Sequence, residues 1–432
     1  MTTRSFWMIS GLFGFMVIVG LIAANNTLIV LAFPLISYLV VAILFAPGEQ
    51  NMRVQRSLST DRISEGVDVT ISLQVNNGNA RIDELHLSEL TSNDFQNLDG
   101  DVSKVARLNP GESLNYQYNF QGWRGKYEFE GLRARLTDPF GLFKVEEQLL
   151  APGNVLVFPR VVPLKEISIQ PPHTKGFSGP IPSRKSGTGM DFFGVRQYQL
   201  GDSLRRINWR KSERHFVNLY TNEYEQERIA DVSILLDARP HCDISFQGRS
   251  LFEYSVHAAA SLSKMFLSQG HCLSLLVYSA VIRQVFPGYG KMQHERILET
   301  LASADTGLNF ARKHLSYLPT RLLPPRGQLV YISPLANSDL EPIIYFRNQG
   351  YAVLVISPDP LYFEQQMESD PSQPDFQLAR RFAKIERNLL ISNLRQTGIQ
   401  VENWTVNQPF SEAAENIRIQ NSLRQRALEA IR

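Results

Sequence analysis

The first part of the chain contains its longest apolar stretch. After Arg4, the next 44 positions hold no Asp, Glu, Lys or Arg, and one membrane-spanning helix needs only ~20 apolar residues. The polar run Asn25-Asn26-Thr27 divides this stretch into two apolar halves, Phe6–Ala24 and Leu28–Phe45. The pattern therefore predicts a transmembrane helical hairpin over residues 1–48.

Basic residues flank this hairpin on both sides, whereas its turn carries no charge. Arg4 precedes it, and Arg53, Arg56 and Arg62 follow it. Because basic residues are enriched on the cytoplasmic side of a membrane, we expect a multi-pass protein of the cytoplasmic (inner) membrane with its soluble domains on the cytoplasmic side. The alternative is one long kinked segment with the remaining chain exported, which would place the Asn25-Asn26 pair at a costly depth in the bilayer.

Strand-like alternation follows the hairpin. Val67–Val75 alternates apolar and polar residues over nine positions, as a half-buried strand does. Turn sequences at 76–79 and 109–112 separate such strands. Short strands at this spacing predict an all-β, immunoglobulin-like sandwich over residues 59–160. Residues 161–190 are rich in proline, glycine and serine and are predicted to form a linker.

The second half of the chain alternates strand and helix patterns. The apolar run Val232–Leu236 is typical of a strand buried on both faces. A helical pattern follows it, and Gly270 ends that helix before the strand Cys272–Tyr278. The same helix–glycine–strand join precedes Tyr351–Ile356 and Ile399–Val406. Repeated units of this kind predict an α/β domain with a mainly parallel sheet.

These patterns together predict a multidomain protein with two transmembrane α-helices, an all-β sandwich and an α/β domain. The α/β domain and the segment before it span residues 191–408, and residues 409–432 are predicted to form a charged helical tail. A formal net charge of +2 over 432 residues indicates no class of partner. Cys242 and Cys272 adjoin apolar runs and are expected to be buried free thiols.

The segment before the α/β domain combines basic, aromatic and turn residues. Between His173 and His215, nine Lys or Arg residues stand against three Asp or Glu residues. The candidate partner-binding or structural residues are Asp191, Phe192, Arg196, Tyr198, Gly201, Asp202, Arg205 and Trp209.

Two interpretations of this segment stay open. As a structural brace, it would bury the Trp209 ring beside the sheet and pair Arg196 with a carboxylate, while Asp202 would accept hydrogen bonds from backbone amides or from Arg205. As a docking surface, it would present Arg, Tyr and Trp, which dominate interface energetics, to a partner. The basic residues also suit an anionic lipid bilayer. No nucleic-acid module is visible, and we expect no nucleic-acid partner.

The segment also resembles a known family. The pattern Gly-x-Asp-Phe-x-x-x-Arg-x-Tyr-x-x-Gly-Asp-x-x-Arg-x-Ile-x-Trp, here Gly189–Trp209, resembles the signature of the domain of unknown function 58 family. Arg124–Tyr127, Asp138–Phe143 and Val157–Arg160 resemble further segments of that family. The resemblance implies membrane anchoring, a von Willebrand factor A-like (Rossmann-type) domain after the signature, and a MoxR-type AAA+ ATPase as partner. It implies no known reaction.

Asp237 is the one candidate metal ligand. It follows the predicted strand Val232–Leu236, where ligands bind in open α/β sheets. Von Willebrand A domains resemble this position, because there Asp-x-Ser-x-Ser offers oxygens to a divalent cation. Here Arg239 and His241 stand in place of the two serines. We therefore expect no cofactor, with a degenerate divalent-cation site at Asp237 as the alternative.

No catalytic residue is assigned from the sequence. Neither a P-loop nor a G-x-S-x-G nucleophile elbow is present. The expected function is that of a membrane-anchored, non-catalytic scaffold or adaptor that works with the AAA+ ATPase in remodelling or assembling proteins. The alternatives are a metal-dependent adhesion module and a membrane-bound hydrolase that uses Asp237 and His241. The sequence identifies neither the client protein nor the oligomeric state.

Overall fold

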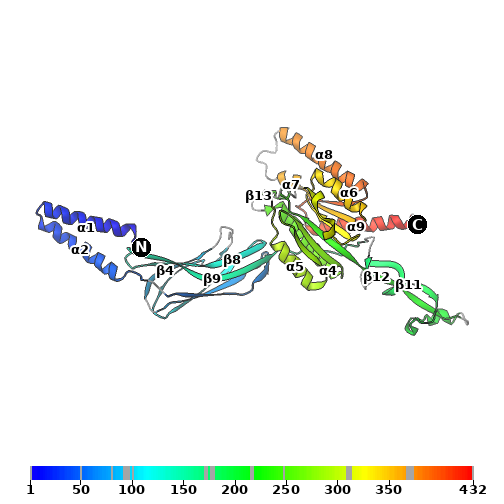
Figure 1. Cartoon of the computed structure of the whole chain (residues 1–432), viewed down its shortest axis with the longest axis horizontal. Helices are drawn as coiled ribbons and strands as arrows, with labels where there is room; N and C mark the ends of the chain where they lie inside the picture. The colour runs from blue at the N-terminus through cyan, green and yellow to red at the C-terminus, as the bar shows by residue number, and fades with distance from the viewer. Residues whose placement is uncertain are drawn as a thin grey trace. The chain divides into compact units, whose positions relative to one another are not determined.

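The computed structural model divides the chain into two compact units, residues 1–158 and residues 159–432 (Figure 1). The structure describes residues 2–48, 51–78, 81–90, 98–99, 102–169, 174–175, 181–214, 218–246, 249–307, 314–365 and 374–430.

The N-terminal unit begins with a helical hairpin made of α1 (Arg4–Ile22) and α2 (Asn26–Leu44). Each helix has 19 residues, and at ~1.5 Å per residue this length nearly equals the ~30 Å hydrocarbon thickness of a bilayer. Both helices are long and apolar enough to cross a membrane. At their turn, the side chain of Asn25 accepts a hydrogen bond from the N–H of Thr27, which caps α2.

Two mostly antiparallel sheets follow the hairpin and face each other across one apolar core. The alternation predicted for residues 67–75 is present in β3, where every second side chain is buried. Arg56 of β1 is also buried, and its guanidinium pairs with Glu89. One sheet has the order β1 (Arg53–Leu58), β3 (Val69–Asn76), β7 (Ser113–Phe120) and β5 (Leu98–Asp99), and the other has the order β2 (Arg62–Ser64), β9 (Lys144–Phe158), β8 (Gly125–Thr137), β4 (Ile82–Leu90) and β6 (Ser103–Leu108).

The loop between β8 and β9 packs against the open end of the hairpin. Leu142 is buried against Leu39 and Ala42 of α2, and Phe6, Ile9, Phe140 and Phe143 pack around this cluster. The backbone N–H of Thr3 donates to the carbonyl of Leu142 at 2.9 Å. The β-sandwich is therefore joined to the hairpin by packing as well as by the covalent chain.

The buried side chain of Asp138 holds this loop in shape, which leads to a testable prediction. Its two carboxylate oxygens accept the N–H groups of Phe140 (3.1 Å) and Phe143 (2.6 Å). We expect Asp138→Ala to lower the free energy of unfolding by about 1–3 kcal/mol, because two amides lose their acceptor. Denaturant unfolding of the detergent-solubilised protein measures this loss. The exposed Asp61 provides the control, and an Asp138 effect no larger than that of Asp61→Ala would contradict the assignment.

The C-terminal unit is built around a sheet of mostly parallel strands. Its main path runs β16 (Arg283–Gly288), β15 (Cys272–Tyr278), β12 (Tyr220–Asp237), β17 (Gln328–Ile332), β18 (Ala352–Pro358) and β19 (Gln400–Trp404), and only the β15–β16 pair on this path is antiparallel. The predicted strands after Gly270, Gly350 and Gly398 are present as β15, β18 and β19. All three glycines adopt the positive φ angles expected of helix-terminating residues.

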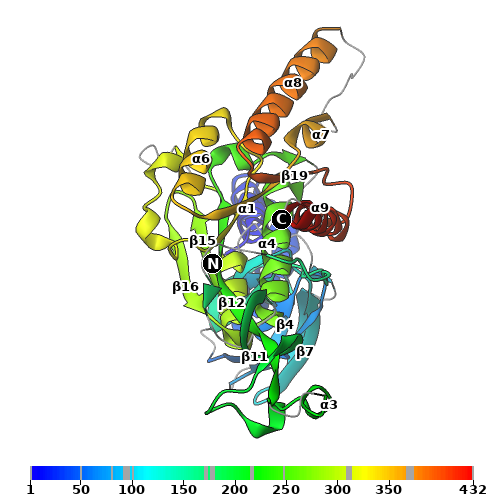
Figure 2. The same cartoon turned by 90° about the vertical axis from the view of Figure 1, so that its right-hand side faces the viewer.

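Helices cover both faces of this sheet (Figure 2). Residues of α6 and α8 belong to the apolar core on one face, together with Leu235 and Tyr331. Helix α4 contacts β12 and β15, and α9 docks on β19. The helices are α4 (Leu251–Ser268), α5 (Gly290–Ala302), α6 (Leu340–Asn348), α7 (Pro360–Gln365), α8 (Pro374–Gln396) and α9 (Phe410–Ala430).

The described residues of the predicted linker differ from the prediction, and residues 170–173 and 176–180 lie outside the described part of the chain. Ile167 and Ile169 are buried, and the N–H of Val162 donates to the Ser261 hydroxyl of α4 at 3.0 Å. Residues from Ile181 onward form β11 (Ile181–Gln197), which pairs antiparallel with β12. Proline and glycine are thus accommodated in a two-stranded ribbon whose register shifts at several positions.

Candidate functional site

The signature segment lies on an arm formed by β11 and the first half of β12 (Figure 1). Between these strands lies the arm tip, defined as residues 198–219 and described except for 215–217. The arm tip holds a short 3₁₀ turn at Leu204–Arg206 and one helical turn, α3 (Trp209–Ser212). Asn208 caps α3 by accepting the N–H of Lys211 and also donates to Asn222 of β12 at 2.8 Å. The tip is therefore anchored to the second strand of the arm.

Arg196 is the centre of a polar brace inside the arm. Its two terminal nitrogens donate to the carboxylate oxygens of Asp202 at 2.7 and 2.6 Å, and its Nε donates to Glu223 at 2.8 Å. Asp202 also accepts the N–H of Gln199 at 2.9 Å. The hydrogen bonds from Arg196 hold the pKa of Asp202 below its usual value. Gly201 has a φ of +107°, a conformation that a residue with a side chain rarely adopts.

The brace predicts how the arm tip responds to a conservative change. Lysine keeps the charge of Arg196 but cannot make its three-point contact with Asp202 and Glu223. We expect Arg196→Lys to loosen the tip, so that trypsin cuts after Arg205 and Arg206 several-fold faster than in the parent protein. Arg205→Lys is the matched control, because that exposed side chain leaves the brace intact. Equal cleavage of both variants would contradict the bracing role.

Trp209 does not lie where the brace interpretation placed it, which was buried beside the sheet. Its side chain is 67% exposed. Ile207 and Ser212 occupy the buried positions of the tip instead, and Ser212 accepts the N–H of Tyr220 at 2.9 Å. Because these two residues face β12, Trp209 at the start of α3 projects into solvent.

Other apolar and basic side chains of the arm are also exposed. The residues concerned are Phe192, Leu200, Leu204, Arg205, Arg210, Arg214 and Leu219. Tyr198 is partly buried, and its hydroxyl donates to the carbonyl of Asp202 at 3.4 Å. The side chain of Asp191 lies outside the described part of the structure. The signature residues thus fall into two groups, with Arg196, Tyr198, Gly201 and Asp202 inside the brace and Phe192, Arg205 and Trp209 on its surface.

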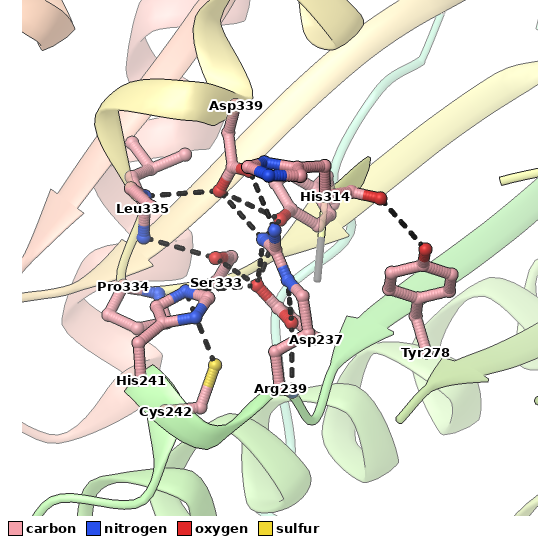
Figure 3. A network of polar contacts seen from close by, with 12 residues as sticks. Asp237, Arg239, His241, Cys242, Tyr278, His314, Ser333, Pro334, Leu335 and Asp339 are labelled. Carbon is pink, nitrogen blue, oxygen red and sulfur yellow. Dashed lines mark hydrogen bonds and ion pairs between the residues drawn. The ribbon is translucent and has the colours of Figure 1, made fainter. Parts of the chain in front are cut away.

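The second candidate region lies at the carboxyl end of β12, where Asp237 is the last residue of the strand (Figure 3). Arg239 donates from Nε to Asp237 Oδ1 at 2.8 Å and from Nη2 to Asp237 Oδ2 at 2.6 Å. The same Nη2 donates to Asp339 Oδ2 at 2.8 Å, and Nη1 donates to Asp339 Oδ1 at 2.9 Å. A single guanidinium therefore bridges two carboxylates that are 102 residues apart in sequence.

Hydroxyl groups complete this buried network. Tyr331 of β17 and Ser333, which directly follows that strand, donate to Asp237 Oδ2 at 2.9 and 2.7 Å. Burial alone would raise the pKa of Asp237, but the hydrogen bonds and charge of Arg239, with His241, lower it overall. Burial raises the pKa of Tyr331, so its hydroxyl stays a donor. Asp237 is thus a charged carboxylate whose acceptor positions are filled by protein donors.

This arrangement does not fit a divalent cation at Asp237. The guanidinium of Arg239 occupies the space between the two carboxylates that a cation would need, and its side chain is only 3% exposed. A positive charge fixed there repels a second cation. Sequence reasoning noted the charge of Arg239 but missed Asp339, because only the neighbouring placement of β12 and β17 brings this residue to Asp237.

The Asp237, His241 and Cys242 side chains also lie together, but not as a catalytic relay. The Nε2 atom of His241 lies 3.3 Å from Asp237 Oδ2, and the same atom lies 3.7 Å from the Cys242 sulfur. A relay needs one ring nitrogen for the carboxylate and the other for the nucleophile. Burial raises the pKa of the Cys242 thiol, which disfavours the reactive thiolate.

One protein-family model matches part of this unit. Residues 194–357 match the model of a family described as protein of unknown function DUF58. The match begins in β11, includes the arm tip and Asp237, and ends in β18. It supports the resemblance drawn from the signature, for a family whose description assigns no activity.

No curated protein matches the chain. Among solved structures, it is similar to the CARDB domain of a Pyrococcus furiosus protein, with 14% identity, 25% of this chain and 93% of that chain covered, and a TM-score of 0.18. It is also similar to the sporulation control protein Spo0M of Bacillus subtilis, with 17% identity, 23% of this chain and 49% of that chain covered, and a TM-score of 0.12. A protein of unknown function from Porphyromonas gingivalis W83 is similar with 14% identity, 35% of this chain and 73% of that chain covered, and a TM-score of 0.19. TM-scores this low support no inference about fold or function.

Proposed function

We propose that this protein is a membrane-anchored, non-catalytic scaffold or adaptor that works with a MoxR-type AAA+ ATPase at the cytoplasmic membrane. The two apolar helices supply the anchor. The partner class is the one implied by the family resemblance, and the matched region contains the arm tip. The role proposed for the system is to remodel or assemble other proteins.

The observation that carries this proposal is the exposed surface of the arm tip. Leu204 and Trp209 are both more than two-thirds exposed on a segment that is held in shape by the Arg196 brace. Large apolar side chains exposed on an ordered element favour a partner that covers them. Arg205 and Arg210 lie beside them in sequence and suit a partner surface with acidic residues.

The order of the sheet supports assigning the α/β unit to the von Willebrand factor A-like, Rossmann-type class. The first strand, β12, lies in the middle of the main path, with β15 and β16 to one side and β17, β18 and β19 to the other. Doubly wound sheets have this outward order from a central first strand. The two alternative functions have less support, since Arg239 stands where an adhesion module needs its cation and His241 makes no relay.

We further propose that the soluble units lie on the cytoplasmic side. Arg4 and the exposed Arg53 and Arg62 flank the hairpin, which fits the positive-inside rule. Arg56 contributes less to this pattern than the sequence indicated, because it is buried in the β-sandwich.

Co-purification from membranes, combined with a reporter for sidedness, tests the proposed function. The full chain, tagged at its C-terminus and extracted in mild detergent, is expected to retain the MoxR-type ATPase of the same cell. A C-terminal reporter fusion is expected to be active only on the cytoplasmic side. An external reporter signal, or the absence of the ATPase from a well-folded preparation, would contradict the proposal.

A further inference from the structure

Two buried carboxylates converge on one side chain at the carboxyl edge of the central sheet (Figure 3). Asp237 ends β12, and Asp339 lies in the 3₁₀ turn Asn337–Asp339 that precedes α6. Both place an oxygen against the same nitrogen, Nη2 of Arg239, at 2.6 and 2.8 Å. The convergence joins the end of the first strand to the start of a helix that covers the sheet.

Hydroxyl oxygens, a histidine nitrogen and backbone amides surround the two carboxylates. His241 Nε2 lies 3.3 Å from Asp237 Oδ2, and the N–H groups of Arg239 and Ala336 donate to the two carboxylates at 3.1 and 3.0 Å. Asp237 Oδ2 is contacted by the hydroxyl groups of Tyr331 and Ser333, and Tyr331 also reaches Asp339 Oδ2 at 3.3 Å. Carboxylate and other oxygen groups clustered in this way form the ligand set of a hard divalent cation. The cluster differs from such a site chiefly because a guanidinium occupies its centre.

We propose that Arg239 is a built-in substitute for a divalent cation at this edge of the sheet. Its charge balances the carboxylates, and its planar fork bridges Asp237 to Asp339 as a bound ion would. The edge is therefore held together without metal. The side chain is too buried to contact an acidic ligand, as an exposed metal ion would do. This inference does not rest on the proposed adaptor function.

The proposal predicts that removing the guanidinium creates a metal site. Arg239→Ser places a small hydroxyl side chain two positions after Asp237 and frees the oxygens of Asp237 and Asp339. We expect the full-length variant in detergent to bind Mn²⁺ with a dissociation constant of roughly 10⁻⁴–10⁻³ M, the range of weak oxygen-ligand sites. Electron paramagnetic resonance of Mn²⁺ measures this binding. At 10 mM Mn²⁺ (roughly 10–100 times that constant) the thermal midpoint of the variant is expected to rise by about 3–8 °C, while the parent protein stays unchanged.

Two controls separate this site from adventitious binding. Arg239→Ser combined with Asp339→Asn removes one carboxylate and is expected to lose most of the Mn²⁺ affinity and the thermal shift. Arg239→Lys keeps a positive charge at the site, and we expect it to bind no Mn²⁺ and to show no thermal shift. Preparing Arg239→Ser in Mn²⁺ from the start covers the case in which the metal-free variant does not fold.

Each other outcome overturns the proposal. Mn²⁺ binding by the parent protein that depends on Asp237 would show that Arg239 does not fill the site. A folded Arg239→Ser that binds no Mn²⁺, or one that remains unfolded in Mn²⁺, would show that the ion cannot replace the guanidinium. Equal binding by Arg239→Lys or by the Asp339→Asn double variant would place the ion elsewhere.

Discussion

Replacing Arg239 with methionine is expected to lower the free energy of unfolding of the C-terminal unit by about 3–5 kcal/mol at pH 7, because removing one partner leaves buried charges uncompensated. Methionine has a similar reach and an apolar body, so the change removes the guanidinium without a large cavity. Asp237 and Asp339 then face each other without a guanidinium between them, and the hydroxyl groups, His241 and two backbone amides beside them supply no full positive charge to replace it. Thermal or denaturant unfolding of the solubilised full chain measures the loss.

The dependence of this loss on pH identifies its cause. In the parent protein the pKa of Asp237 lies below its usual value, so its charged form adds stability above pH ~4 that disappears as the pH falls through the folded-state pKa. Without Arg239, burial dominates and the folded-state pKa of Asp237 rises above the unfolded value. The buried charge of Asp237 then lowers the free energy of unfolding of the variant at neutral pH, and this loss is recovered as the carboxylate takes up a proton. The difference between parent and variant should therefore shrink from pH 7 toward pH 4.

Arg321→Met is the matched control for this prediction. Arg321 is an exposed arginine of the same unit, and its replacement is expected to change stability by no more than about 0.5 kcal/mol. A loss for Arg239→Met that does not exceed this control, or that grows on acidification, would contradict the bridging role of the guanidinium.

Truncating Trp209 to alanine is expected to weaken capture of the AAA+ ATPase by at least about 30-fold, the effect of losing a ~2 kcal/mol interface hot spot. The change should leave folding intact, because the ring is exposed and the buried contacts of the tip come from Ile207 and Ser212. Quantitative binding of the purified ATPase to the solubilised parent and variant measures the effect.

Trp123 offers a control of the same residue type. It is a half-exposed tryptophan of the N-terminal unit, outside the arm. We expect Trp123→Ala to bind the ATPase as the parent does, and Leu204→Ala to show a smaller loss than Trp209→Ala. If all three variants bind equally while remaining folded, the arm tip is not the docking surface.

Much of the fold follows from local patterns in the sequence. The uncharged start of the chain predicted two apolar helices, and α1 and α2 differ from the expected limits by only one or two residues. Gly270, Gly350 and Gly398 predicted helix ends, because glycine readily adopts the positive φ angle that ends many helices. All three have positive φ angles in the structure. These features depend on residues close in sequence, where spacing alone is informative.

Features that depend on distant residues were not predictable in the same way. Asp339 meets Arg239 only because β12 and β17 are neighbours in the sheet, and no spacing in the sequence indicates that contact. The sequence indicated Arg56 as a basic residue flanking the hairpin. In the structure its side chain is buried in the β-sandwich, where it pairs with Glu89. The brace interpretation placed the Trp209 ring beside the sheet, but Ile207 fills the inner position instead. The residue types alone do not indicate which of two nearby apolar side chains, Trp209 or Ile207, faces the interior.

Site-specific photo-crosslinking in living cells would show whether the arm tip binds an AAA+ ATPase at the membrane, as proposed. A photoreactive phenylalanine analogue would replace Leu204, with the same analogue at Trp123 as the reference position. We expect a covalent adduct between position 204 and the MoxR-type ATPase, and none at position 123. An adduct formed only with lipid, or no protein adduct at position 204 from a folded and membrane-inserted chain, would contradict the proposal.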